Sequence, residues 1–264
     1  MKKYLYFFKV GFQVTLAYPA KIVFRFLRHA VYFALSITLW WALLGTTGHL
    51  GNLTLSSMIT YYLLVGAVDI IYTSAPGRIL IRDILSGDLN NYLAKPINYW
   101  GYLLPYTLGQ QLAASSLSIF VVALVFVLFP TIIALPASPL NIVAFLISCI
   151  ISFLLSHQFF FIVGILGFWV SEATNLRMGL NQFIGLVGGK WFPLSILPPA
   201  VFVIFNLMPF KYLFNFPITV FLGQVQPDEV VKSIGMETIW IALILFAGSY
   251  LWKKGIKKYE AYGR

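Results

Sequence analysis

The stretch HAVYFALSITLWWALLG, residues 29–45, decides the class of this protein. It contains no Lys, Arg, Asp or Glu, and its length approaches the roughly 20 apolar residues that a helix needs to cross about 30 Å of hydrocarbon. A second such stretch, IGMETIWIALILFAGSYLW, occupies residues 234–252 near the other end of the chain. Both predict membrane-spanning helices.

The composition of the whole chain supports this interpretation. Of its 264 residues, 60% are hydrophobic and 10% are charged, whereas a soluble domain carries roughly 25% charged residues. One core could not bury that much apolar surface, so lipid is the expected solvent. A net charge of +10 would indicate nucleic-acid binding only if the basic residues formed a patch on a folded, soluble surface. In a membrane protein, the same excess indicates basic residues that face the cytoplasm and anionic lipid headgroups.

The apolar runs predict an all-α integral membrane protein with six transmembrane helices. Besides a first span at 28–45 and a last at 234–252, long runs lie at 55–76, 100–128 and 141–169. A sixth apolar region, 179–222, is irregular, and we expect the fifth span at its start, about 179–193. The chain is therefore expected to form a single transmembrane domain over 1–264.

The positions of Lys and Arg predict the orientation. With a cytoplasmic N-terminus, 15 of the 18 basic residues fall on the inner side. The outer side then holds Lys190, Lys211 and Lys232, and the short outer loops around 46–54 and 130–141 hold no basic residue. This bias is typical of membrane proteins and predicts that both termini are cytoplasmic.

The leader, residues 1–27, mixes lysines with Tyr and Phe and contains Pro19. Aromatic rings and snorkelling lysines suit an interfacial helix that lies in the headgroup plane. The alternative is that the leader simply extends the first span, and Arg25 and Arg28 argue against it.

The outer region at 190–223 is rich in proline. Only nine residues separate Pro199 from Pro209, and at about 1.5 Å per residue they reach less than half of the bilayer. We therefore expect a broken, re-entrant helix pair before the last span, with its backbone satisfied by protein or water. The prolines expected to shape an outer gate are Pro193, Pro198, Pro199, Pro209 and Pro217.

Signatures of enzymes and metal sites are missing from the sequence. There is no HExxH, no GxSxG and no Cys/His metal spacing. Directly before GLVGGKWF, residues 185–192, Ile184 stands where a Walker loop needs Gly. The single cysteine, Cys149, lies in an apolar run and reads as a small buried hydrophobe. The chain is expected to be a non-enzyme without a cofactor or metal of its own, so any nucleotide energy must come from a partner.

Two ionisable residues are expected well inside the spans, and Glu172 and Glu237 near their boundaries. Asp69 falls in the inner half of the second span, and His157 falls near the middle of the fourth. Because charges at the bilayer centre cost about 3 kcal/mol or more, such residues are functional candidates. Each could line a transport path, or could serve only as a hydrogen-bonding partner between helices.

The stretch RDILSGDLNNYLAKPINYW, residues 82–100, is a polar elbow within the predicted cytoplasmic loop 76–99. Apolar residues recur at three- and four-residue steps, with Arg82, Asp83, Asn90 and Asn91 off the stripe. Gly87 interrupts a single helix, Ser86 or Asp88 can cap a second one, and Pro96 ends it. We expect two short amphipathic helices, which either contact a cytoplasmic partner or form a solvated loop with none.

Two motifs resemble permease subunits of type-2 ATP-binding-cassette exporters. Residues 84–97 match the loop pattern I-x-x-G-x-L-x-x-x-L-x-K-P-I, and residues 192–217 match F-P-L-x-x-L-P … P-F-x-Y … P. Both lie at the corresponding places of the topology, and the resemblance covers essentially the whole chain.

The resemblance implies partners and roles. Such permeases work with a second, identical or homologous permease and with a separate ATPase that holds ATP and Mg, in a bacterial inner membrane. It implies that the loop is a coupling helix on that ATPase, and that the substrate is a small hydrophobic or cationic compound or a lipid. The implied coupling residues are Arg82, Asp83, Gly87, Asp88, Leu89, Tyr92, Leu93, Lys95 and Pro96.

The alternative is a stand-alone channel or another non-ABC membrane protein. A conduction path would usually show rings of polar residues on one helical face. A neighbouring gene for a Walker-containing ATPase would favour the exporter.

Overall fold

The computed structural model describes residues 2–45, 49–50, 53–136 and 138–259. Four helices in this part are long and apolar enough to cross a membrane: α2 (Pro19–Leu44), α6 (Tyr99–Leu128), α7 (Pro139–Ile165), which continues as the 3-10 turn η1 (Leu166–Phe168), and α11 (Pro227–Lys258). A shorter apolar helix, α3 (Leu55–Ile71), lies among them. The helical, multi-pass class predicted from the apolar runs is confirmed.

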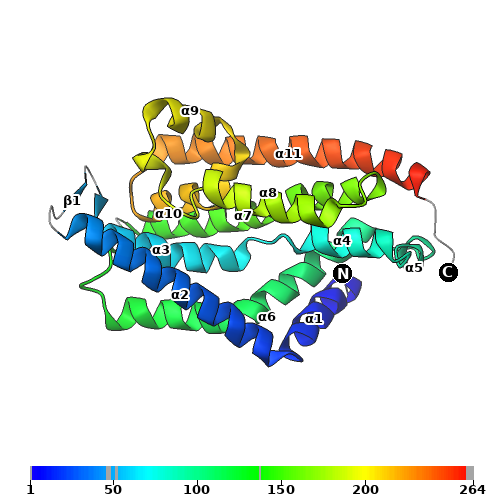
Figure 1. The fold of residues 1–264 in the computed structure, drawn as a ribbon, viewed down its shortest axis with the longest axis horizontal. Helices are drawn as coiled ribbons and strands as arrows, with labels where there is room; N and C mark the ends of the chain where they lie inside the picture. The colour runs from blue at the N-terminus through cyan, green and yellow to red at the C-terminus, as the bar shows by residue number, and fades with distance from the viewer. Residues whose placement is uncertain (1, 46–48, 51–52, 137, 260–264) are drawn as a thin grey trace.

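The long helices run along one axis of the molecule (Figure 1). At one end lie α1 (Lys2–Leu16), the end of α11, and the short helices α4 (Ala75–Leu85) and α5 (Asn90–Leu93). At the other end lie α9 (Pro199–Leu207) and a minimal antiparallel hairpin of β1 (His49–Leu50) and β2 (Leu53–Thr54), which pairs His49 with Thr54 and Leu50 with Leu53. We call these the elbow end and the hairpin end.

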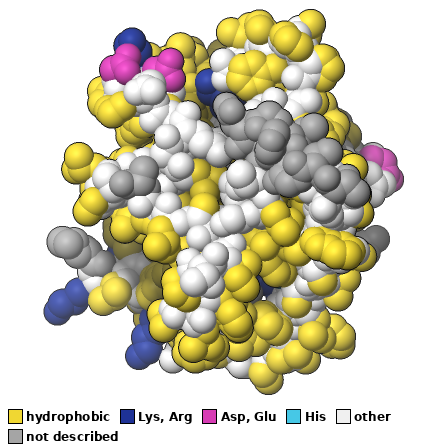
Figure 2. Space-filling model, turned by 90° about the vertical axis from the view of Figure 1, so that its left-hand side faces the viewer, with side chains coloured by type: hydrophobic (Ala, Val, Ile, Leu, Met, Phe, Trp, Pro, Cys, Tyr) yellow, Lys and Arg dark blue, Asp and Glu magenta, His cyan; other side chains and the backbone are white. Residues whose placement is uncertain are grey.

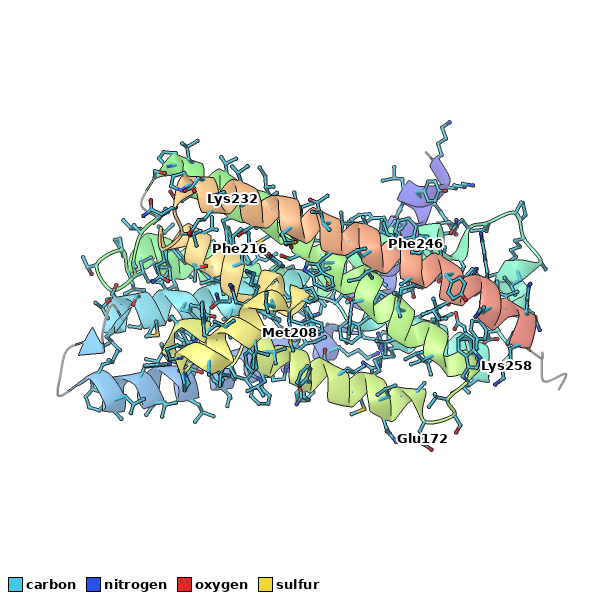
Figure 3. All side chains as sticks on the ribbon, turned by 90° about the horizontal axis from the view of Figure 1, so that it is seen from above. Glu172, Met208, Phe216, Lys232, Phe246 and Lys258 are labelled. Atoms are coloured by element: carbon cyan, nitrogen blue, oxygen red, sulfur yellow. The ribbon has the colours of Figure 1, made fainter. Side chains whose placement is uncertain are left out.

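The surface of this bundle suits lipid. Large apolar side chains such as Phe246 and Leu140 are each 78% exposed, which a soluble protein would rarely tolerate over so wide an area. Phe246 projects from α11 in Figure 3. Viewed from the hairpin end, the surface is largely apolar or uncharged, with few Lys or Arg side chains (Figure 2).

The leader differs from its predicted bounds. Helix α1 ends at Leu16, and residues 19–27 form the first turns of α2, since Pro19 takes the first helical position, where its missing N–H costs nothing. Helix α1 packs tightly on α6, where the carbonyl of Tyr106 occupies the space that a Cβ at Gly11 would need. Arg25 and Arg28 are therefore part of α2, where Arg28 is exposed and the partly buried Arg25 needs polar partners within the protein.

The irregular region begins earlier than predicted. Helix α8 (Ala173–Val187) starts six residues before the expected 179, and it is followed by the turn η2 (Leu194–Ile196), α9, η3 (Pro209–Leu213) and α10 (Asn215–Phe221). With 15 residues, α8 is about 22 Å long, too short to cross the hydrocarbon. The chain after α8 consequently begins inside the bundle.

Candidate functional site

The backbone of the elbow turns at Gly87. Helix α4 ends at Leu85, Gly87 takes φ +81°, and α5 begins at Asn90. A left-handed φ favours glycine because a Cβ would clash with the following carbonyl. The predicted pair of short helices on either side of Gly87 is confirmed.

One side of the elbow is buried and fixed by Asp83, which is 1% exposed. The Tyr99 hydroxyl donates to Asp83 Oδ2 at 2.7 Å, and Arg82 donates to Oδ1 through Nε and Nη2 at 3.1 and 2.8 Å. These hydrogen bonds raise the pKa of the Arg82 guanidinium. Leu89 is fully buried, and the half-buried Tyr92 packs against Tyr99 with 5.2 Å between ring centroids. The carboxylate thus joins α4 to the first turn of α6.

The other side of the elbow is exposed. The predicted coupling residues therefore divide into two groups, because Asp83 and Leu89 support the elbow while five others face outward: Arg82, Asp88, Leu93, Lys95 and Pro96. The outward face also contains Leu85, Ser86, Asn90 and Asn91, which the prediction left out. Leu85 and Leu93 are apolar, yet they are 50% and 41% exposed.

A polar cavity of about 690 Å³ lies between α1, α2, α6, α8 and the α3–α4 connection. Its cationic lining comes from five side chains: Lys21, Arg25, Arg28, Arg78 and Lys190. Asp69 is the only carboxylate among the described lining residues, and His29, four amides and several hydroxyls complete the polar wall. The cavity is large enough for a drug-sized molecule.

Asp69 lies at the end of α3 and is 5% exposed. It forms an ion pair with Lys190, and His29 Nε2 lies 3.4 Å from its second oxygen. This contradicts the assignment of Lys190 to the outer side. Because α8 is short, Lys190 follows it at the depth of Asp69, which the sequence places near the inner end of its span.

The backbone around Lys190 is held by tyrosine hydroxyls. Tyr61 donates to the carbonyl of Gly189 at 2.5 Å, Tyr32 to that of Lys190 at 2.7 Å, and Tyr62 to that of Trp191 at 2.7 Å. In lipid, backbone groups without helical partners must be satisfied by protein. The tyrosines supply these partners, and we call residues 188–191 the buried turn.

His157 lies elsewhere. It is fully buried in α7, between the rings of Trp100 and Phe153, and it is not among the residues that line the cavity. The structure therefore does not bring Asp69 and His157 to one site. Glu237 of α11 is also fully buried, with Ser152 Oγ 3.2 Å from its carboxylate, an environment that its place near a span boundary did not predict.

Four of the five prolines between residues 190 and 223 lie at the boundaries of the short helices there. Pro193 precedes η2, and Pro198 precedes α9. Pro199 begins α9, and Pro209 begins η3. Pro217 instead lies inside α10 and is buried. Asn215 links the region to the buried turn, because its N–H donates to the Gly188 carbonyl at 2.9 Å and its side chain accepts from Leu194 N–H at 3.1 Å.

A bundle of lipid-facing helices with a polar cavity inside and an anchored loop at one end defines a multi-pass membrane transport subunit. Among the described residues, no group of three or more His, Cys, Asp or Glu is placed to hold a metal ion. Comparison with family models matches residues 30–263 to the ABC-2 family transporter protein. The chain belongs to this family. It is a permease component of an ABC transporter, a transport subunit that works with an ABC ATPase. Comparison with curated proteins gives no match.

Proposed function

We propose that this chain is the membrane permease of an ATP-driven exporter in a bacterial inner membrane, with both termini cytoplasmic. It pairs with a second permease, identical or homologous, and each permease contacts a separate ATPase that holds ATP and Mg. The family assignment favours this function over a stand-alone channel.

The distribution of charge supports the orientation. Lys258 and Glu172 lie toward the elbow end, whereas Lys232 lies toward the hairpin end (Figure 3). Because Lys190 pairs with Asp69 inside the bundle, it no longer counts as an outer residue, and the inward bias of Lys and Arg becomes stronger. The elbow end is therefore the cytoplasmic end.

Six membrane elements follow from this orientation: α2, α3, α6, α7, α11, and α8 together with the short helices after it. Helix α8 enters from the cytoplasm and ends part-way. The segments α9, η3 and α10 then fold within the outer half as the re-entrant region, and the prolines at their boundaries shape the outer gate.

The observation that carries the proposal is the two-sided elbow. Asp83 joins its buried side to α6, which lines the cavity through Gln110 and Gln111. The exposed side offers two leucines among charged and amide side chains, a composition suited to a protein partner. A movement of the partner against the exposed side of the elbow would thus be transmitted to the cavity-lining helix α6 through the hydrogen bond between Asp83 and Tyr99.

Charge reversal on the exposed side tests the coupling. The permease is co-expressed with its partner ABC ATPase, purified in a mild detergent, and reconstituted in vesicles. We expect Asp88→Arg to insert normally and to reduce the permease-dependent part of the ATPase activity by about tenfold, because a mismatched charge at an interface costs on the order of 1.4 kcal/mol or more.

The matched control is Asp228→Arg, which reverses an exposed carboxylate at the start of α11, toward the other end of the molecule. It should leave the activity and the amount of co-purified ATPase unchanged. Equal activity in the Asp88→Arg complex and the parent would show that the elbow does not couple the two subunits.

A further inference from the structure

The cavity has a charge imbalance that its own side chains do not correct. Asp69 is already paired with Lys190 and approached by His29. Among the described residues, no ion pair serves the four other cations: Lys21, Arg25, Arg28 and Arg78. Arg177 adds a further positive charge nearby, since its Nη1 donates to Ser74 of the cavity wall at 3.3 Å.

Arg25 shows how these cations are held. Its Nη1 donates to Gln111 Oε1 at 2.6 Å, and its Nη2 donates to the Asp69 carbonyl at 3.1 Å. Its Nε is buried and has no hydrogen-bonding partner among the described residues. The guanidinium is thus positioned by neutral acceptors, which fix its direction without neutralising its charge.

Arg25 is the least exposed of these four cations, and an uncompensated charge at its position is costly. A charge inside a membrane costs about 3 kcal/mol or more unless a partner or water compensates it, and a buried charge is retained mainly where it is paired or has a function. Guanidinium groups bind phosphate and carboxylate groups through strong, charge-assisted hydrogen bonds. An anionic ligand would supply the negative charge that the lining lacks.

We infer that this cavity binds an anionic ligand, with a phosphate or carboxylate group held by Arg25 and Arg28, and that the transported substrate belongs to this class. The assignment of the ligand as substrate rests on the proposed export function. It replaces the cationic substrate class implied by the resemblance, because a cation would be repelled by this wall. The volume leaves room for a larger body beyond the anionic group.

Three amphiphiles with the same tail and different headgroups test the inference: dodecyl phosphate, dodecyltrimethylammonium and dodecyl maltoside. Binding is measured below their micelle concentrations, on the full chain in phosphatidylcholine nanodiscs. We expect dodecyl phosphate to bind at least about tenfold more tightly than the other two, the ratio that one charge-assisted hydrogen bond provides. Equal or tighter binding of the trimethylammonium compound would overturn the inference.

Two variants locate the site. Arg25→Gln and Arg28→Gln should each weaken dodecyl phosphate binding by about tenfold. Arg28 is exposed and has no side-chain hydrogen bond among the described residues, so its replacement should not disturb folding. Lys9→Gln removes an exposed cation of α1 outside the cavity and should change binding by less than about twofold. Unchanged binding in the Arg28→Gln variant would contradict the assignment.

Competition identifies the source of the anion. Displacement of dodecyl phosphate by phosphatidylglycerol in the nanodisc would identify a lipid headgroup, and displacement by glycerol phosphate would identify a soluble ligand. Either result supports an anion site, and failure of both to compete opposes it.

The ATPase activity of the whole complex is measured separately with the same probes. Selective binding without stimulation would leave the anion site standing and count against coupled export. Stimulation of the ATPase by the trimethylammonium compound would support coupled export and count against an anionic substrate.

Discussion

The elbow at Gly87 and the buried turn at Gly189 have the same local geometry and opposite surroundings. Each follows a helix, and each has glycine at positive φ, +81° and +86°. At the elbow, short-range bonds such as Asn90 N–H to the Gly87 carbonyl, 3.2 Å, and exposure satisfy the backbone. At the buried turn, three consecutive carbonyls accept from tyrosines of α2 and α3. An interrupted helix within the membrane therefore needs hydrogen-bonding partners from distant parts of the chain, whereas an interrupted helix in water does not.

This difference has a functional consequence. The elbow's polar groups are free to contact another protein, while those of the buried turn are occupied in fixing Lys190 at the cavity wall. Substitutions at each turn measure how much stability that turn draws from its surroundings. Unfolding is followed in one detergent for all variants.

The largest expected effect comes from the Asp69–Lys190 pair of the buried turn. Asp69→Asn leaves Lys190 without its anion in an already cationic cavity, and we expect the free energy of unfolding to fall by about 3 kcal/mol. Asp228→Asn is the matched control, because it removes an exposed carboxylate paired with Lys232 at 3.1 Å, and it should cost less than about 1 kcal/mol. Equal losses would show that the buried pair contributes no more than a surface pair.

A smaller effect is expected from the tyrosine cradle. Tyr61→Phe keeps the buried ring but leaves the Gly189 carbonyl without its donor, which should lower the free energy of unfolding by about 2 kcal/mol. Tyr6→Phe removes a hydroxyl from a ring that is 64% exposed on α1, and its effect should lie within about 0.5 kcal/mol. If Tyr61→Phe is as stable as Tyr6→Phe, water or a rearranged donor satisfies the carbonyl.

The same contrast explains what the sequence could predict. The elbow was predictable because its determinants are local: Gly87 breaks the helix, and the residues around it follow a helical period. The class of protein was predictable because the length of an apolar run in the sequence shows directly whether a helix can cross a membrane. The pairing of Asp69 with Lys190 joins residues 121 positions apart, and no local pattern encodes it.

Two further errors have the same origin. Hydropathy placed Lys190 outside because it counts apolar residues along the chain and cannot register that the helix α8 ends after 15 residues. Arg25 and Arg28 were taken as evidence that the leader does not extend the first span, since the sequence could not reveal the cavity that they line within α2. The sequence also could not show which elbow residues are buried. Asp83 and Asp88 are both acidic residues of the predicted loop, yet Asp83 is buried against Tyr99 and Asp88 is exposed.

The smallest loss of stability is expected at the elbow itself. Gly87→Ala introduces a Cβ at φ +81°, which costs about 1 kcal/mol, while water continues to satisfy the exposed backbone. Gly235→Ala is the control, because that helical glycine of α11 has open space around its Cβ position and alanine favours a helix, so stability should hold or rise slightly. The permease-dependent ATPase activity should fall in Gly87→Ala more than its modest loss of stability explains, since the angle between α4 and α5 sets the exposed face. A parallel fall of the ATPase activity in Gly235→Ala would show that the loss is not specific to the elbow.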